Sequence, residues 1–187
     1  SVVGSNGSGK TSMLNIICGS IAPDSGRIIL ADRDIVRESE HRRARRMGRV
    51  YQNPAMGTCA SMTILENMAL ADNKGKRYDL RPGTDRRRVE AYKELLRPLG
   101  LGLENMMNSK VGALSGGQRQ ALSLIMSSMT PIEFLILDEH TAALDPKTAE
   151  IIMQLTDRIV REKKLTALMV THNLRYALEY GDRLLMM

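Results

Sequence analysis

Residues 4–11 read Gly4-Ser5-Asn6-Gly7-Ser8-Gly9-Lys10-Thr11. This stretch decides the fold, because it fits the G-x-x-x-x-G-K-[ST] pattern of a loop that wraps phosphate groups. Its glycines let backbone N–H groups converge on an anion, and the helix that follows adds the positive end of its dipole. Residues 1–3 are typical of a strand end, and residues 11–18 have a helical rhythm. The order strand, loop, helix predicts a P-loop α/β fold whose loop, with Ser12, binds nucleotide phosphates.

Length and composition suit one globular domain with a buried core. The 187 residues are 43% hydrophobic and 26% charged, which excludes disordered and collagen-like chains. No apolar run reaches the roughly 18 residues that suggest a membrane span. Cys18 and Cys59 are too far apart for a close metal-ligand pair, so we expect reduced, buried thiols in a cytosolic setting.

Much of the net charge of +6 lies in two basic runs, residues 41–46 and 86–88. Such charge suits nucleic acid, an anionic membrane surface or a phosphorylated ligand. Neither run contains an aromatic residue, so a base-stacking platform is unsupported. We interpret the runs as solvated helix faces, with lipid headgroups and nucleic acid as the alternatives.

The middle of the chain is helical in pattern. After β-type runs at 27–30 and 49–51, which flank a helix-like stretch at 37–46, helices are expected at 62–71 and 84–99. Thr63-x-x-Glu66 has the spacing of a capping box, and the polar residues 72–83 between the two helices predict a surface loop.

Alternating strands and helices return near the C-terminus. Strands are expected at 133–138, 167–171 and 183–187, the first apolar enough to be buried on both faces of a parallel sheet. Asp145-Pro146 is typical of a helix start. The changes in strand and helix pattern along the chain predict three parts: sheet core at 1–52, a helical subdomain at 53–131 and more sheet core at 132–187.

A second glycine-rich stretch reads Leu114-Ser115-Gly116-Gly117-Gln118. Ser115 and Gln118 fit a capping box, which leaves the two adjacent glycines unexplained. Glycines in a first turn weaken a helix, so we interpret them as room for a phosphate that approaches the backbone beside Ser115.

At this stretch the chain resembles the ATP-binding cassette (ABC) family, whose signature is LSGGQ, and the resemblance covers essentially the whole chain. Residues 135–139, Leu-Ile-Leu-Asp-Glu, resemble the family's Walker B strand. The resemblance implies a RecA-like parallel sheet with an inserted α-helical subdomain and an N-terminal antiparallel β subdomain that is largely missing here. It implies binding of ATP and Mg²⁺, with Thr11, Gln52 and Asp138 at the metal and Glu139 as general base.

Three more positions match family motifs. Gln52 matches the Q-loop glutamine and His172 the switch histidine, so the resemblance places both in catalysis with Glu139. Asp145 resembles the aspartate that crosses the dimer interface, and it also fits an N-cap. His140 replaces a proline that many family members have; no second histidine lies nearby to suggest a metal site, and we expect no loss of chemistry.

The resemblance also implies partners. Two copies would face head to tail, so that ATP on one is closed over by Ser115, Gly116, Gly117, Gln118 and Asp145 of the other. The whole would be the ATPase of an importer, peripheral on the cytoplasmic face of the membrane through permease subunits, with a secreted substrate-binding protein. Amino-acid uptake systems of the tryptophan and tyrosine type are the nearest likeness. Residues 53–62, with Met56 and Met62, would lie where the permease docks.

Two alternative functions are disfavoured. A soluble ABC ATPase acting on DNA or ribosomes would use the arginine runs, but the span from Gln52 to Ser115 has room only for a compact helical subdomain, so we expect no nucleic-acid partner. A regulator that no longer hydrolyses ATP is disfavoured because Glu139 and His172 are present. We also expect Ser1 and Met187 to be truncation points, with an upstream adenine-stacking aromatic missing and a sheet edge exposed.

Overall fold

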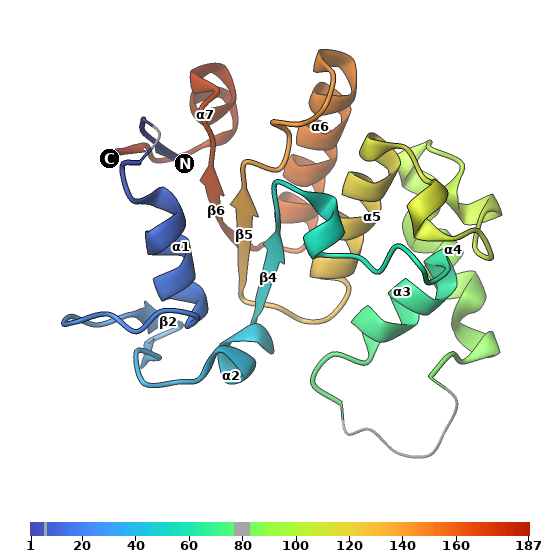
Figure 1. Ribbon diagram of the computed structural model, residues 1–187, viewed down its shortest axis with the longest axis horizontal. Coiled ribbons are helices and arrows are strands. Elements are labelled where there is room, and N and C mark those ends of the chain that lie inside the picture. The colour runs from blue at the N-terminus through green and yellow to red at the C-terminus, as the bar shows by residue number, and fades with distance from the viewer. Residues whose placement is uncertain (6, 77–82) are drawn as a thin grey trace.

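A parallel β-sheet forms the centre of the protein (Figure 1). The computed structural model describes residues 1–5, 7–76 and 83–187. The strands are β1 (Val2–Val3), β4 (Met47–Val50), β5 (Phe134–Asp138), β6 (Thr166–Val170) and β7 (Leu185–Met186). Their order is β4-β5-β6-β1-β7, and each neighbouring pair is parallel. The predicted P-loop α/β fold with a parallel sheet is confirmed.

Strand β5 is buried on both faces, as its apolar sequence predicts. Ile136 packs in one cluster with Leu14, and Leu135 and Leu137 pack in a second cluster with Ile152. Successive side chains of a strand point to opposite faces, so these clusters lie on the two sides of the sheet. The buried strand therefore fixes where its last residue, Asp138, is presented.

The described residues contain seven α-helices. They are α1 (Lys10–Cys18), α2 (Glu40–Ala44), α3 (Ile64–Asp72), α4 (Val89–Leu96), α5 (Gly116–Ser128), α6 (Pro146–Glu162) and α7 (Leu174–Tyr180). Short 3₁₀ turns occur at 54–56, 86–88, 97–99, 103–105 and 111–113. Thr63 and Ser115 each form the predicted capping box, and Asp145 caps α6.

Helices α3, α4 and α5 lie together beside the sheet (Figure 1). Their apolar faces meet at Met68, Tyr92 and Leu122. Helix α5 also contacts β4, so it joins this helical region to the sheet. The boundaries at 52/53 and 131/132 stay predictions, and residues 77–82 of the predicted surface loop lie outside the described residues.

Of the β-type run expected at 27–30, residues 29–30 form a strand, and this strand belongs to a small hairpin. Strands β2 (Ile29–Leu30) and β3 (Arg33–Asp34) pair antiparallel and form the one antiparallel sheet of the described residues. The two residues between them, Ala31 and Asp32, have φ angles of 47° and 59°. This two-residue turn with positive φ has the hand that matches strand twist, although it lacks glycine.

The interpretation of residues 41–46 as a solvated helix face is wrong at Arg43. This side chain is 2% exposed. Its guanidinium donates to the carbonyls of Ile16 and Ile17, 2.7 and 2.9 Å away, at the C-terminal end of α1. Carbonyls in the last turn of a helix lack partners within the helix. Arg43 therefore supplies hydrogen-bond donors to the end of α1, a segment distant from it in the chain.

Two further expectations can be compared with the structure. Cys18 and Cys59 are free thiols, as predicted, but both are partly exposed rather than buried. Within residues 1–5, 7–76 and 83–187, none of the helices has the length and apolar character needed to cross a bilayer.

Candidate nucleotide-binding site

The phosphate loop connects β1 to α1, as its motif requires. Gly7 and Gly9 have φ angles of 82° and 96°, a left-handed conformation that glycine adopts without strain. Gly9 is also the N-cap of α1, so the loop leads directly into the positive end of a helix dipole. Asn6 lies outside the described residues. The loop thus has the backbone that an anion site needs.

Lys10 is bent back over this loop. Its Nζ atom donates to the carbonyls of Gly4 and Ser5 at 2.9 and 2.7 Å, and lies 3.5 Å from Ser8 Oγ. The residue is only 7% exposed, which holds one positive charge against the loop. Thr11 and Ser12 are exposed in the first turn of α1, so their hydroxyls are accessible beside that charge.

Asp138 ends β5 and is held by Arg49 of β4. Asp138 Oδ2 accepts a hydrogen bond from Arg49 Nη2 at 2.7 Å. Within the described residues, no cluster of three or more His, Cys, Asp or Glu side chains could enclose a metal. Mg²⁺ usually takes only one or two carboxylates and completes its shell with phosphate oxygens and water. The oxygen donors of Asp138 and Thr11 therefore fit the Mg²⁺ that the resemblance implies.

Glu139 has an unusual backbone for a glutamate. Its φ angle is 46°, in the left-handed region, and its N–H donates to Val170 O at 2.9 Å. Its carboxylate Oε2 lies 3.4 Å from His172 Nδ1, which follows β6. Both residues line a pocket of about 190 Å³ with Thr141, Thr171 and Asn173. Backbone strain next to a cleft is typical of functional sites, and here it directs a carboxylate toward an exposed histidine.

His140 follows Glu139 in the chain and packs against α6. It is buried, and its Nε2 lies 3.1 Å from Thr156 Oγ1, whose hydroxyl also donates to Ile152 O. Burial lowers its pKa to about 4, so the ring is neutral near pH 7. His140 thus ties the turn after β5 to α6, and its contacts are those of a packed structural residue.

Gln52 follows β4 and is exposed. The carbonyl of its neighbour Tyr51 accepts a hydrogen bond from Gln120 Nε2 of α5, at 3.1 Å. Neither Gln120 nor Arg49 is predicted from the sequence to lie at the site. A signal for Arg49 was present, because it is the one charged residue in a strand otherwise made of Met47, Gly48 and Val50.

Residues 115–118 form the start of α5. Ser115 Oγ accepts from Gln118 N at 3.2 Å, and Gln118 Nε2 donates to Leu101 O at 3.2 Å. A Cβ atom on Gly117 would overlap Thr148 Cγ2, so a larger residue here would force a local rearrangement within the chain. One of the two glycines that we interpreted as room for a phosphate therefore has a local cause.

No hydrogen bond or ion pair joins residues 115–118 to residues 4, 5 or 7–12 among those that the structure describes. Asp145 likewise uses its carboxylate locally. Hydrogen bonds from the Thr148 side chain and backbone N–H lower its pKa. The structure thus places Lys10 against the phosphate loop, Arg49 against Asp138, and His172 against Glu139. The hydrogen bonds of residues 115–118 and of Asp145 are made to other residues.

A groove of about 540 Å³ lies between the sheet and the helical region. Arg49 and Tyr51 line it from the sheet side, and Leu70 of α3, Met126 of α5 and Lys74, shortly after α3, line it from the helical region. Met56 and Met62 do not line this groove. Met56 is 69% exposed, and the next residue in the chain, Gly57, does line the groove.

Comparison with known proteins adds to this geometry. The sequence profile of a family described as ABC transporter matches residues 1–142. The tyrosine transport ATP-binding protein of Clostridioides difficile is 52% identical over 187 residues, which are all of this chain and 74% of that protein. The probable branched-chain amino acid transport ATP-binding protein of Archaeoglobus fulgidus is 34% identical over 97% of this chain and 72% of its own length. A dimeric ATP-binding cassette in a post-hydrolysis state, bound to ADP and phosphate, matches with a TM-score of 0.81 at 29% identity, covering all of this chain and 79% of that one.

Proposed function

This chain belongs to the ABC transporter family, and we propose that it binds and hydrolyses ATP as the nucleotide-binding subunit of an amino-acid importer. The resemblance predicted from residues 4–11 and 114–118 is thereby confirmed at the level of the family. Relatives that match most of the chain are ATP-binding proteins of tyrosine transport, of branched-chain amino acid transport and of phosphonate import. The tyrosine transport relative supports an aromatic amino acid as the transported class.

The observation that carries the proposal is the placement of Lys10. Its ammonium group is held against the loop carbonyls at the start of α1, where an incoming phosphate would meet the charge and the exposed N–H groups together. Gly4, Ser5, Gly7, Ser8, Gly9, Thr11 and Ser12 surround this point, and we keep Asn6 among the proposed contacts.

The chemistry follows from groups at the ends of neighbouring strands. Glu139 would accept a proton from the attacking water, and His172 would contact the terminal phosphate from the adjacent strand end. Asp138, with Thr11 and Gln52, would hold Mg²⁺, which when bound neutralises phosphate charge. The φ angle of Glu139 supports this role, because a strained backbone persists only where its surroundings enforce it.

A second copy of the chain would complete the site. Ser115, Gly116 and Asp145 are exposed, and in the described part of the chain no hydrogen bond or ion pair joins them to their own phosphate loop. The dimeric post-hydrolysis cassette supports a head-to-tail pair in which residues 115–118 and Asp145 face the nucleotide of the partner. A single copy is then expected to be nearly inactive.

Permease subunits would bind at the groove that Arg49, Tyr51, Leu70, Lys74 and Met126 line. The groove is next to Gln52, so a docked helix would contact both the sheet and the helical region. This would place the protein peripherally on the cytoplasmic face of the membrane, with a secreted substrate-binding protein in the complete system.

Binding of a fluorescent ATP analogue tests the proposal directly. Lys10→Ala should weaken binding at least tenfold, because it removes the charge nearest the phosphates. Lys147→Ala, at an exposed position in the first turn of α6, is the matched control and should bind as the wild type does. Unchanged binding by a folded Lys10→Ala variant would exclude the phosphate loop as the nucleotide site.

A further inference from the structure

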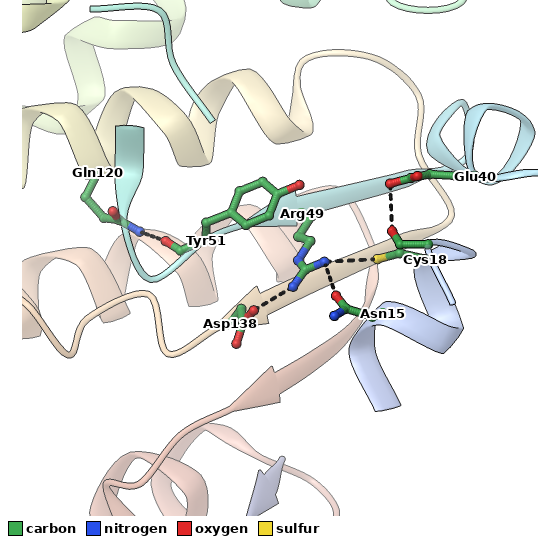
Figure 2. Close-up of polar contacts among 8 residues, drawn as sticks. Asn15, Cys18, Glu40, Arg49, Tyr51, Gln120 and Asp138 are labelled. Atoms are coloured by element: carbon green, nitrogen blue, oxygen red, sulfur yellow. Dashed lines mark hydrogen bonds and ion pairs between the residues drawn. The ribbon is translucent and has the colours of Figure 1, made fainter. Parts of the chain in front are cut away.

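Arg49 and Asp138 meet across two paired strands (Figure 2). In the register of β4 and β5, Arg49 lies opposite Ile136, so its long side chain runs along the sheet to reach the carboxylate two residues further on. The side chains are 15% and 16% exposed, and the N–O distance is 2.7 Å. An ion pair this short and this shielded fixes the orientation of the carboxylate.

The guanidinium is itself held from three sides. Nη1 donates to Asn15 Oδ1 at 3.1 Å and lies 3.8 Å from Cys18 Sγ, both on α1. The group stacks over the ring of Tyr51 at 4.6 Å from its centroid. Figure 2 shows these contacts converging on one side chain from the helix after the phosphate loop and the residue before Gln52. Arg49 is therefore positioned by the same elements that carry the proposed nucleotide contacts.

Only one oxygen of Asp138 is engaged. Arg49 contacts Oδ2, and among the described residues no hydrogen bond reaches Oδ1. A carboxylate buried without a counter-charge is unfavourable, so Arg49 compensates its charge. The same positive charge opposes a divalent cation that approaches Asp138 when no phosphate is present.

We propose that Arg49 is a positioning residue that holds and neutralises the Asp138 carboxylate, so that a divalent cation binds there only together with nucleotide phosphates. Because Asp138 is a metal ligand only within the proposed function, this role of Arg49 rests on it. Arg49 cancels the negative charge of Asp138, so the phosphates must supply the negative charge that attracts the cation. Because Arg49 holds Oδ2, Oδ1 is the oxygen that the cation would contact. Cation and nucleotide binding are thereby coupled.

The test measures Mn²⁺ binding by electron paramagnetic resonance, with and without a non-hydrolysable ATP analogue. We expect Arg49→Met to bind Mn²⁺ about tenfold more tightly than the wild type when nucleotide is absent, since a like charge is removed. The factor by which the analogue strengthens Mn²⁺ binding should fall by a similar amount. Arg49→Lys keeps the charge, so its affinity for Mn²⁺ alone should stay within about threefold of the wild type.

Two controls separate this role from a structural one. Asp138→Asn should abolish the gain, so Arg49→Met/Asp138→Asn should bind Mn²⁺ no better than Asp138→Asn alone. Arg42→Met removes an exposed arginine and should change nothing. If Arg49→Met does not fold, Arg49→Gln takes its place, because it also removes the charge.

Each outcome is decisive. Mn²⁺ affinity and coupling within twofold of the wild type in folded Arg49→Met or Arg49→Gln would overturn the role of Arg49. In that case the proposed function would stand as long as the wild type binds the ATP analogue. Failure of the wild type to bind the analogue would instead count against the proposed function itself.

Discussion

His172 Nδ1 lies 3.4 Å from Glu139 Oε2; Glu139 is the first residue after β5, and His172 is the second residue after β6. Strands β5 and β6 are parallel neighbours, with Asp138 opposite Val170, so the residues after them emerge at the same edge. The backbone N–H of Glu139 also donates to Val170 O. The pairing of the strands therefore brings a carboxylate and an imidazole together, although their chain positions are far apart.

Replacing Glu139 by Gln tests the proposed general base. The amide keeps the size of the side chain but cannot accept the proton, so ATP hydrolysis should fall by at least about 10²-fold while ATP binding remains. We expect an ATP-dependent dimer to accumulate, which size-exclusion chromatography with and without ATP would detect. Phosphate release at the wild-type rate would remove Glu139 from this role.

His140 predicts a pH dependence of stability. Its pKa is about 4 in the folded protein, below the ordinary value of 6.5, because burial disfavours the charged ring. Between these values the unfolded chain binds more protons than the folded one, so stability falls as pH falls from 6.5 to 4. The loss should approach about 3 kcal/mol below pH 4.

Urea unfolding from pH 7.5 to 4 would measure this loss. His140→Gln is the comparison, because its amide can still reach Thr156 but does not titrate. The variant should lose less stability than the wild type over the same range. Parallel curves for the two proteins would show that His140 does not cause the pH dependence.

Replacing Arg43 should lower the stability of the fold substantially, although the basic sequence around it is typical of a solvated surface. Arg43→Met would remove the side-chain donor from the carbonyls of Ile16 and Ile17 and leave Ile16 O with the Gly19 N–H alone, and we expect a loss of about 2–4 kcal/mol in the free energy of unfolding. The neighbouring Arg42 is exposed, so Arg42→Met should change stability by less than about 0.5 kcal/mol. Thermal or denaturant unfolding of both variants checks this difference, and equal effects would contradict it.

Features with strong local patterns were predictable. The phosphate loop, the capping boxes at Thr63 and Ser115, and the buried strand ending at Asp138 each depend on residues within a few positions of one another. Their local preferences agree with the final fold, which is why sequence alone was enough to place them.

Features that depend on distant partners were not predictable. Arg43 is buried because the end of α1, 26 and 27 residues earlier, offers it carbonyls. Arg49 reaches Asp138 across 89 residues, through a strand pairing that no local pattern reveals. The turn at Ala31 and Asp32 was missed because neither residue is the glycine that usually marks such a hairpin.

Gly117 and Gly116 predict opposite outcomes for the same substitution. An added methyl at Gly117 would overlap Thr148 Cγ2, so Gly117→Ala should lower the free energy of unfolding by about 1–3 kcal/mol. At Gly116 the nearest atom, Leu144 Cδ2, is 3.8 Å away, and Gly116→Ala should be neutral or stabilising by up to about 1 kcal/mol. Denaturant unfolding of the two variants measures the contrast.

Thr148→Ser identifies the cause of the Gly117 effect, because it deletes Cγ2 and keeps the hydroxyl. The double variant Gly117→Ala/Thr148→Ser should recover most of the stability that Gly117→Ala loses, and Thr148→Ser alone should have a smaller effect. If stability recovers while ATP-dependent dimerisation does not, the methyl also obstructs the partner's phosphate, and Gly117 has the second role that its place beside Ser115 suggests. Failure of the double variant to recover stability would show that the packing against Thr148 is not what requires a glycine here.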